Sequence, residues 1–175
     1  MSVQGNYQLS MSFTELLYNP SSALALETIT RTFADGATAI TISDGSGVDQ
    51  VSKAFALRET LTATSRTLDL TNLTTTTGGT VTTVSFSLLK LVYAVNDATG
   101  EGQFLKIGGA GSAPFYAWWG GSTHYEKLPP LGSQFLKVNR GQQTSNPWTV
   151  DGSNKNLLID AGASTIPYRL LILGC

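Results

Sequence analysis

Hydrophobic and polar residues alternate along most of this chain, which is the pattern of half-buried β-strands. In "ETITRTF" (27–33) Ile29 stands between polar neighbours, and "TAITIS" (38–43) repeats the alternation. Between the two runs lies Asp35-Gly36, a favoured dipeptide for the type I′ turn of a hairpin. We therefore expect these two runs to pair as a β-hairpin.

The middle of the chain continues the same alternation. The segment "KAFALRETLTATSRTLDLTNL" (53–73) predicts one or two strands, and the threonines of "TTTTGG" (74–79) then predict a loop or a strand edge. The segment "TVTTVSFSLLKLVYAVND" (80–97) is the most hydrophobic of all. Its end is apolar on both faces and predicts a central strand. A helix is the competing interpretation, but the β-branched and aromatic residues argue against it.

Four further apolar runs complete the chain, and turn residues separate them. They are "QFLKIGG" (103–109), "LPPLGSQFLKV" (128–138), "KNLLIDAG" (155–162) and "STIPYRLLILG" (164–174). Only "SFTELLYNPSS" (12–22) suggests a short helical turn, which Pro20 would end. We therefore predict an all-β protein.

The expected architecture is a single β-sandwich or jelly roll of about eight strands. Residues 51–175 are expected to form this sandwich domain. Residues 1–50 are expected to form an N-terminal arm or an extra hairpin, which packs on the sandwich or extends from it.

Composition points to association with other molecules. Only 13% of the residues are charged, against about 25% in an average soluble domain. Lysine and arginine number 11 and aspartate and glutamate 12, so the net charge is −1. Without a basic patch, binding to nucleic acid is not expected. A net charge near zero promotes association. Two explanations are open: abundant threonine, serine and glycine supply the solubility, or neighbouring chains cover much of the surface.

No targeting segment or metal motif is visible in the sequence. The start "MSVQGNYQLSMSF" has neither a basic region nor a long apolar run, so we expect neither export nor membrane insertion. Cys175 is the only cysteine, and the chain has one histidine. An intrachain disulfide is therefore excluded, and no metal-ligand spacing exists.

The sequence also lacks a convincing catalytic constellation, and we expect no catalytic residue and no cofactor. His124 lies in a loop flanked by glycine and serine, with no nucleophile motif beside it. Glu59 and Asp69 alternate with apolar residues on probable strands, which predicts that both face outward. A small hydrolase that uses these three residues is the least favoured alternative. The glycine-rich "IGGAGSAP" (107–114) is interpreted as a turn, because no helix follows it to hold a dinucleotide.

The aromatic stretch "SAPFYAWWGGSTHYEKLPPLG" (112–132) is the strongest candidate for a functional site. If it is extended, its two adjacent tryptophans point to opposite sides, so that one packs in the core while the other faces a partner. Plain packing and stacking on a sugar are the alternatives. The candidate interface residues are Tyr116, Trp118, Trp119, His124 and Tyr125. The prolines of "LPPLG" stiffen the turn that follows.

The order of these motifs over residues 58–174 resembles small β-sandwich structural proteins of tailed-bacteriophage virions. The segments that carry the resemblance are "RTLDLTNLTTTTGGTVTTVSFSLLKLVYAVND", "LKIGGAGSAPFYAWWGG", "LPPLGSQFLKV" and "NLLIDAGASTIPYRLLILG". The matching positions are structural ones: Asp69, Leu70, Gly108, Gly109, Trp119, Pro130, Gly132, Asp160, Tyr168 and Gly174. The sequence departs from the pattern at Leu131, which replaces a glycine.

The resemblance implies a non-enzymatic role in a virion, for a protein made in the host cytoplasm. The favoured role is a capsid decoration (cement) protein, which would form a homo-oligomer and bind the major capsid protein or other virion proteins. A head–tail connector or a tail structural protein is one alternative. A carbohydrate-binding or receptor-binding β-sandwich module is the other, although sugar binding is not favoured.

Overall fold

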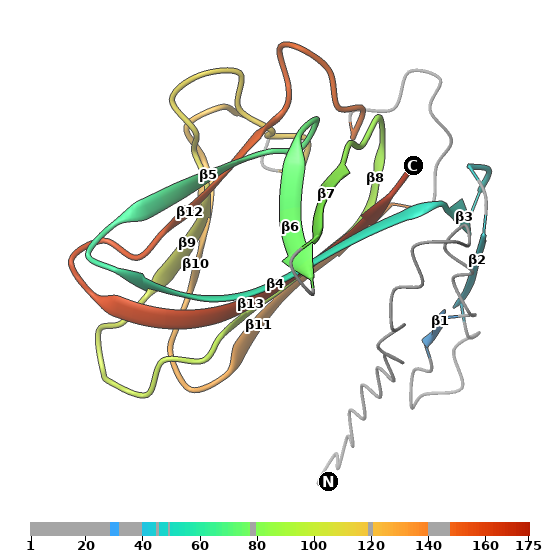
Figure 1. Ribbon diagram of the computed structural model, residues 1–175. Coiled ribbons are helices and arrows are strands. Elements are labelled where there is room, and N and C mark those ends of the chain that lie inside the picture. Colours follow the sequence, from blue (N-terminus) through green and yellow to red (C-terminus); the bar gives the residue numbers. More distant parts are fainter. Residues whose placement is uncertain are drawn as a thin grey trace, which may run out of the picture.

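The computed structural model describes residues 29–31, 40–44, 46–48, 50–77, 80–118, 121–139 and 148–175. These residues form thirteen strands, and none of them lies in a helix. The prediction of an all-β protein is therefore confirmed for the described part of the chain (Figure 1). The suggested helical turn at 12–22 and Trp119 lie outside the described residues.

Two four-stranded antiparallel sheets make up the body of the molecule. Sheet A has the order β10 (Tyr125–Leu128), β9 (Leu105–Gly108), β12 (Asn156–Asp160) and β5 (Ser65–Asp69). Sheet B has the order β11 (Ser133–Val138), β8 (Leu89–Asn96), β13 (Thr165–Gly174) and β4 (Lys53–Thr62). Strand β8 lies between β11 and β13 and is almost completely buried, so its prediction as a central strand is confirmed.

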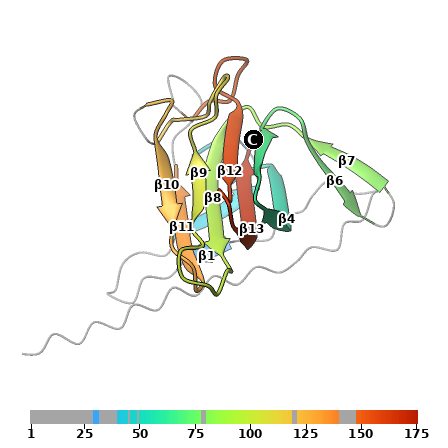
Figure 2. The ribbon, with the colours of Figure 1, turned by 90° about the vertical axis from the view of Figure 1, so that its left-hand side faces the viewer.

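One hydrophobic core joins the two sheets, because alternate residues of each sheet point toward the other. Sheet A contributes Leu68, Leu105, Ile107, Leu128, Leu157 and Ile159. Sheet B contributes Phe55, Leu61, Val92, Ala94, Phe135, Ile166, Tyr168, Leu170 and Ile172. The molecule is therefore sandwich-like, with both sheets covering the same core (Figures 1 and 2).

Strand β13 closes the fold at the C-terminal end of the chain. It pairs along its whole length with β4, from Thr165 opposite Thr62 to Gly174 opposite Lys53. It also pairs with β8, and the register between these two strands shifts at Gly174. A Cβ atom at Gly174 would collide with the carbonyl oxygen of Leu88, so only glycine allows this close approach.

The run of threonines forms a strand. Strand β6 (Leu73–Thr77) pairs antiparallel with β7 (Thr80–Val84) as a separate two-stranded sheet. Figure 2 shows this hairpin to one side of the two larger sheets. Threonine suits this position because its branched side chain favours strands while its hydroxyl tolerates water.

A small N-terminal sheet contains β1 (Ile29–Arg31), β2 (Ile40–Asp44) and β3 (Gln50–Val51). Strands β1 and β2 pair antiparallel, which confirms the predicted hairpin pairing, while its turn at 32–39 lies outside the described residues. Strand β3 pairs in parallel with β2 and contains the predicted domain boundary at residue 50.

Candidate interaction surface

Part of the outer face of sheet B is apolar, although the outer face of a sandwich normally carries polar side chains. Strand register places Leu136 opposite Tyr93, Tyr93 opposite Leu171 and Leu171 opposite Ala56. We call these four residues the apolar row. Ala56 is exposed and the other three side chains are half-buried.

The apolar row continues into a second hydrophobic cluster, separate from the core. Leu91 and Leu173 belong to this cluster and are almost fully buried, together with Val51 of β3. Lys90, only 2% exposed, donates a hydrogen bond to the carbonyl oxygen of Gly47 at 3.0 Å. Gly47 and Val51 therefore pack at one end of sheet B.

Charged residues lie beside the apolar row, on the side away from Leu91 and Leu173. Arg169 and Arg58 lie directly opposite each other on neighbouring strands. Arg169 donates two hydrogen bonds to the carboxylate of Asp97, at 2.7 and 2.8 Å, and this planar fork arrangement fixes its side chain. Burial raises the pKa of Tyr93 above its ordinary value, so the hydroxyl of Tyr93 stays neutral in the apolar row.

The outer face of sheet A has the opposite character. Lys106 and Lys127 lie opposite each other on β9 and β10. Lys106 pairs with Asp160 at 3.3 Å and lies 5.5 Å from the ring centre of Tyr125. Paired charged side chains lie on this face, so it does not require a covering partner. The contrast between the two faces singles out sheet B as the candidate interaction surface.

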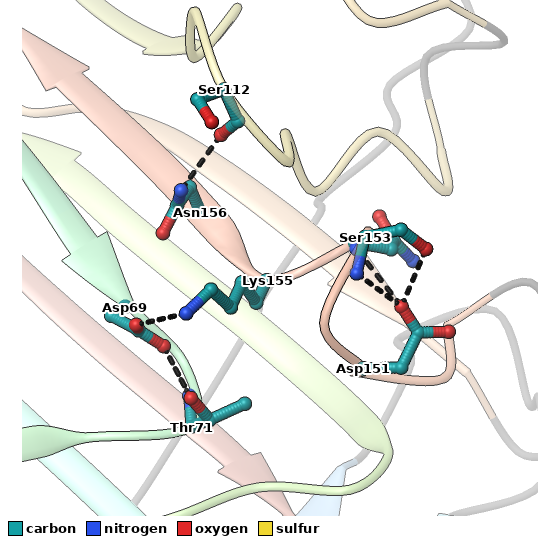
Figure 3. Close-up of polar contacts among 8 residues, drawn as sticks. Asp69, Thr71, Ser112, Asp151, Ser153, Lys155 and Asn156 are labelled. Carbon is teal, nitrogen blue, oxygen red and sulfur yellow. Dashed lines mark hydrogen bonds and ion pairs between the residues drawn. The ribbon is translucent and has the colours of Figure 1, made fainter.

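Asp69 is bound by a polar cluster, which Figure 3 shows. Its carboxylate accepts hydrogen bonds from Lys155 at 2.7 Å and from the hydroxyl and backbone N–H of Thr71. Burial alone would raise the pKa of Asp69, but these hydrogen bonds outweigh it and hold the pKa below its ordinary value. The arrangement ties the end of β5 to the segment that enters β12.

Replacing Lys155 with methionine is expected to raise the pKa of Asp69 toward its ordinary value. Because the folded-state pKa is depressed, the charged form of Asp69 stabilises the fold above its unfolded-state pKa of about 4, and this contribution is lost as pH falls through the folded-state value. The variant should therefore lose less stability than the wild type over that acidic interval. NMR titration of the carboxylate measures the pKa, and an unchanged value would contradict the role of Lys155.

Glu59 faces the core side of sheet B, so the prediction that it faces outward is wrong. It shares the face of β4 that carries Phe55 and Leu61. Its carboxylate accepts hydrogen bonds from Arg66 at 2.6 Å and from the hydroxyl of Tyr168 at 2.9 Å. Burial, together with the Glu59 carboxylate, raises the pKa of Tyr168 far above its ordinary value. Arg66 from sheet A and Tyr168 from sheet B itself therefore make an inward carboxylate tolerable.

The two carboxylates considered for hydrolysis engage different partners. Glu59 binds Arg66 and Tyr168, whereas Asp69 binds Lys155 and Thr71. His124 is exposed in the loop before β10. Within the described ranges, no group of three or more histidine, cysteine, aspartate or glutamate residues is placed to hold a metal ion.

The aromatic loop packs Trp118 toward the interior. Its ring lies 4.9 Å from Phe115, 4.9 Å from Trp148 and 5.9 Å from Phe135, measured between ring centres. Trp118 is half-buried and packs against the main core. The opposite orientation expected for Trp119 stays a prediction, because Trp119 lies outside the described residues.

The remaining aromatic-loop candidates lie at the surface. Tyr116 is 43% exposed and Tyr125 is 51% exposed, and His124 is exposed beside Tyr125. The backbone N–H of Tyr116 donates to the side chain of Asn154, which places it against the Asp151–Asn154 turn drawn in Figure 3. The loop therefore offers exposed rings at its two ends and an inward Trp118 between them.

The glycine-rich segment before this loop makes a turn, as interpreted from the sequence. Gly108 and Gly109 have φ values of 107° and 76°, a region that favours glycine. The following backbone forms a bridge between Pro114 and Asn156 and starts no helix through residue 118. The geometry of a dinucleotide site is therefore missing here.

Comparisons with known proteins identify no relative. No family model matches this chain, and no curated protein or solved structure is a significant match. Across the residues that the structure describes, no helix has the length and apolar character needed to cross a membrane.

Proposed function

We propose that this protein is a non-enzymatic structural component of a virion, most directly a capsid decoration protein that binds the major capsid lattice. The observation that carries the proposal is the apolar outer face of sheet B, with Leu136, Tyr93, Leu171 and Ala56 in one row. Apolar area shared with other chains is the main source of free energy in protein assembly. The low charge of the chain supports the same role.

The proposed fold is a jelly roll of eight strands. Each sheet combines strands that are distant in sequence: β12 lies between β9 and β5, and β13 lies between β8 and β4. Such orders arise from two Greek keys wound together, an architecture common among viral capsid proteins and lectins. Because one fold supports many functions, the strand order supports a virion role without defining it.

The polar contacts support a structural interpretation rather than a catalytic one. Each carboxylate considered for hydrolysis is bound by cations or hydroxyl groups that tie one strand or turn to another. For Asp69 these partners hold the pKa below its ordinary value, which does not prepare the carboxylate to accept a proton from a substrate. We therefore assign these groups to stabilising the fold.

Quantitative mass spectrometry of purified particles, from the virus whose genome encodes the chain, tests the proposed function. For a decoration protein we expect a copy number comparable to that of the major capsid protein, on the order of hundreds per particle, because each lattice position offers an equivalent site. About a dozen copies or fewer would instead support the connector or tail alternative. Absence from the particles would contradict a virion role.

A further inference from the structure

Strand β4 forms one edge of sheet B and is the longest edge strand of the two main sheets. It has ten residues, whereas the other edge strands, β5, β10 and β11, have five, four and six. It pairs with β13 without a shift in register, and it contains no proline. Proteins normally shorten, bend or cover such edges, because their unpaired backbone groups accept another strand.

A hydrogen bond just beyond β4 shows which backbone groups of this strand face away from β13. The N–H of Ala63 donates to the carbonyl oxygen of Ser164, and these two residues continue the register of β4 and β13. In an antiparallel pair, hydrogen-bonded residues alternate with non-hydrogen-bonded ones. The odd-numbered residues of β4 therefore bond to β13. The backbone groups of the even-numbered residues point to the free edge, among them Ala56, Arg58, Thr60 and Thr62.

The segment 56–62, which we call the β4 edge, is open to solvent. All four of its even-numbered residues are exposed. Among the described residues, no backbone group of the β4 edge forms a hydrogen bond outside the sheet. The threonine hairpin approaches β4 at its start, where Lys53 donates to the carbonyl oxygen of Ser85 at 2.6 Å. The β4 edge therefore offers backbone donors and acceptors that another strand can reach.

Arg58 gives the β4 edge a positive charge that the described part of the chain does not neutralise. It lies opposite Arg169, whose guanidinium already occupies both carboxylate oxygens of Asp97, at 2.7 and 2.8 Å. Among the described residues, no carboxylate pairs with Arg58. Like charges directly opposite each other are destabilising. A carboxylate on the free side of β4 would therefore stabilise Arg58.

We propose that the β4 edge binds an extended segment of a partner protein as a fifth strand of sheet B, with a carboxylate of that segment beside Arg58. Pairing with the outward backbone groups supplies the affinity, and alternate side chains supply the specificity. An inward side chain of the partner lies beside Leu57, which packs against the core, so an aliphatic residue suits that position. The outward side chain beside Arg58 is aspartate or glutamate.

The occupant is therefore a segment in which aliphatic and polar residues alternate and one polar residue is acidic. This inference goes beyond the proposed function, because a partner inside or outside a virion can carry such a segment.

Titration of the full-length protein with a capped seven-residue peptide, followed by NMR of the backbone amides, tests the proposal. The peptide alternates valine with polar residues and has glutamate at its centre, and a matched peptide has lysine there. We expect the glutamate peptide to bind with a Kd on the order of 100 μM, and the shifted amides to include Ala56, Arg58 and Thr60. The lysine peptide should bind about tenfold more weakly, because its charge repels Arg58. No binding of the glutamate peptide up to about 2 mM would overturn the proposal.

Arg58→Glu reverses the charge on the β4 edge. This variant should prefer the lysine peptide over the glutamate peptide. An unchanged preference would contradict the proposed carboxylate beside Arg58.

Thr60→Pro removes one outward N–H from the β4 edge. Thr60 lies opposite Pro167, whose carbonyl oxygen accepts from Asp97 on the other side of β13, so the substitution breaks no hydrogen bond of the sheet. Thr67→Pro is the matched control. Thr67 is an exposed threonine on β5, the edge of sheet A, and the hydrogen bond from Leu70 to Lys155 places its N–H on the free side. Thr60→Pro should abolish peptide binding, whereas Thr67→Pro should leave it unchanged.

A charged residue on an edge strand has a second explanation, which is to repel other strand edges. Arg58→Ala separates the two roles. Loss of a binding residue should weaken the affinity for the glutamate peptide by about threefold to fivefold. If Arg58 only repels other edges, the variant should bind the peptide like the wild type and self-associate in sedimentation velocity, which would overturn the proposal.

A Thr60→Pro variant that binds like the wild type would also overturn it. If Thr60→Pro does not fold, the preference of Arg58→Glu and the position of the shifted amides decide. None of these outcomes changes the copy number in particles, which tests the proposed function separately.

Discussion

Replacing Asn96 with alanine is expected to lower the free energy of unfolding by about 3 kcal/mol. Asn96 is fully buried. Its side-chain amide donates to the carbonyl oxygens of Gln103 and Leu128, at 2.7 and 2.9 Å, and its oxygen accepts from the N–H of Ala98 at 3.0 Å. Alanine leaves these three backbone groups without that partner, and each unsatisfied buried group costs about 1–3 kcal/mol.

Urea denaturation measures this change in free energy. Gln134→Ala is the matched control, because Gln134 is an exposed amide on β11, the neighbouring strand of sheet B. Its substitution should change the free energy of unfolding by no more than about 0.5 kcal/mol. Equal effects of the two substitutions would show that the network around Asn96 does not hold the turns together.

Asn96 also supports the turn that contains Leu131 and Gly132. The side chain of Asn96 joins the segment after β8 to the end of β10, and its backbone carbonyl accepts from Gly132. Loss of this network should therefore loosen the turn that carries Leu131. A local polar network thus connects the stability of the sandwich to the geometry of this turn.

The alternation of apolar and polar residues was sufficient to predict most of the strands, because successive side chains of a half-buried strand point alternately to the core and to solvent. The central position of β8 followed from apolar residues on both of its faces. The apolar part of the outer face of sheet B gave the same signal in "RLLILG" (169–174). Its four successive apolar residues place apolar side chains on both faces of the strand. That signal could have revealed the face, but the pairing of Leu171 with Tyr93 and Ala56 requires the three-dimensional register.

The orientation of Glu59 could not be predicted, because alternation alone does not say which set of residues faces the core. An inward carboxylate is stable when hydrogen-bonding partners reach it. Arg66 reaches Glu59 from sheet A, and Tyr168 lies directly opposite it on the neighbouring strand of sheet B. No sequence motif connects Glu59 to either partner. The pairing of these side chains is a property of the packed sheets.

For the aromatic loop, the sequence predicted that one of the two adjacent tryptophans faces inward and the other outward, without saying which. The contacts of Trp118 show why it faces the interior: its ring packs against Phe115 of the same loop and against Phe135 and Trp148 from other parts of the chain. Such long-range aromatic contacts leave no local pattern in the sequence. Tyr116 and Tyr125 remain the exposed members of the candidate interface.

Trp118→Ala is therefore expected to destabilise the fold, by about 2–3 kcal/mol. Truncation of a buried aromatic residue costs about 3–5 kcal/mol, and the half-buried position of Trp118 reduces this value. Tyr116→Ala is the control from the same loop, with an expected loss of no more than about 1 kcal/mol at its exposed position. Thermal and urea denaturation of the two variants measure the difference.

Binding to purified particles separates packing from recognition in this loop. If Trp118 stabilises the fold, Trp118→Ala should bind with unchanged occupancy at temperatures well below its lowered melting temperature, because the exposed surface is preserved. Tyr116→Ala should show the reverse, with a native melting temperature and reduced occupancy, if the exposed ring contacts the lattice. A Trp118→Ala variant that melts like the wild type but no longer binds would instead place Trp118 in the interface.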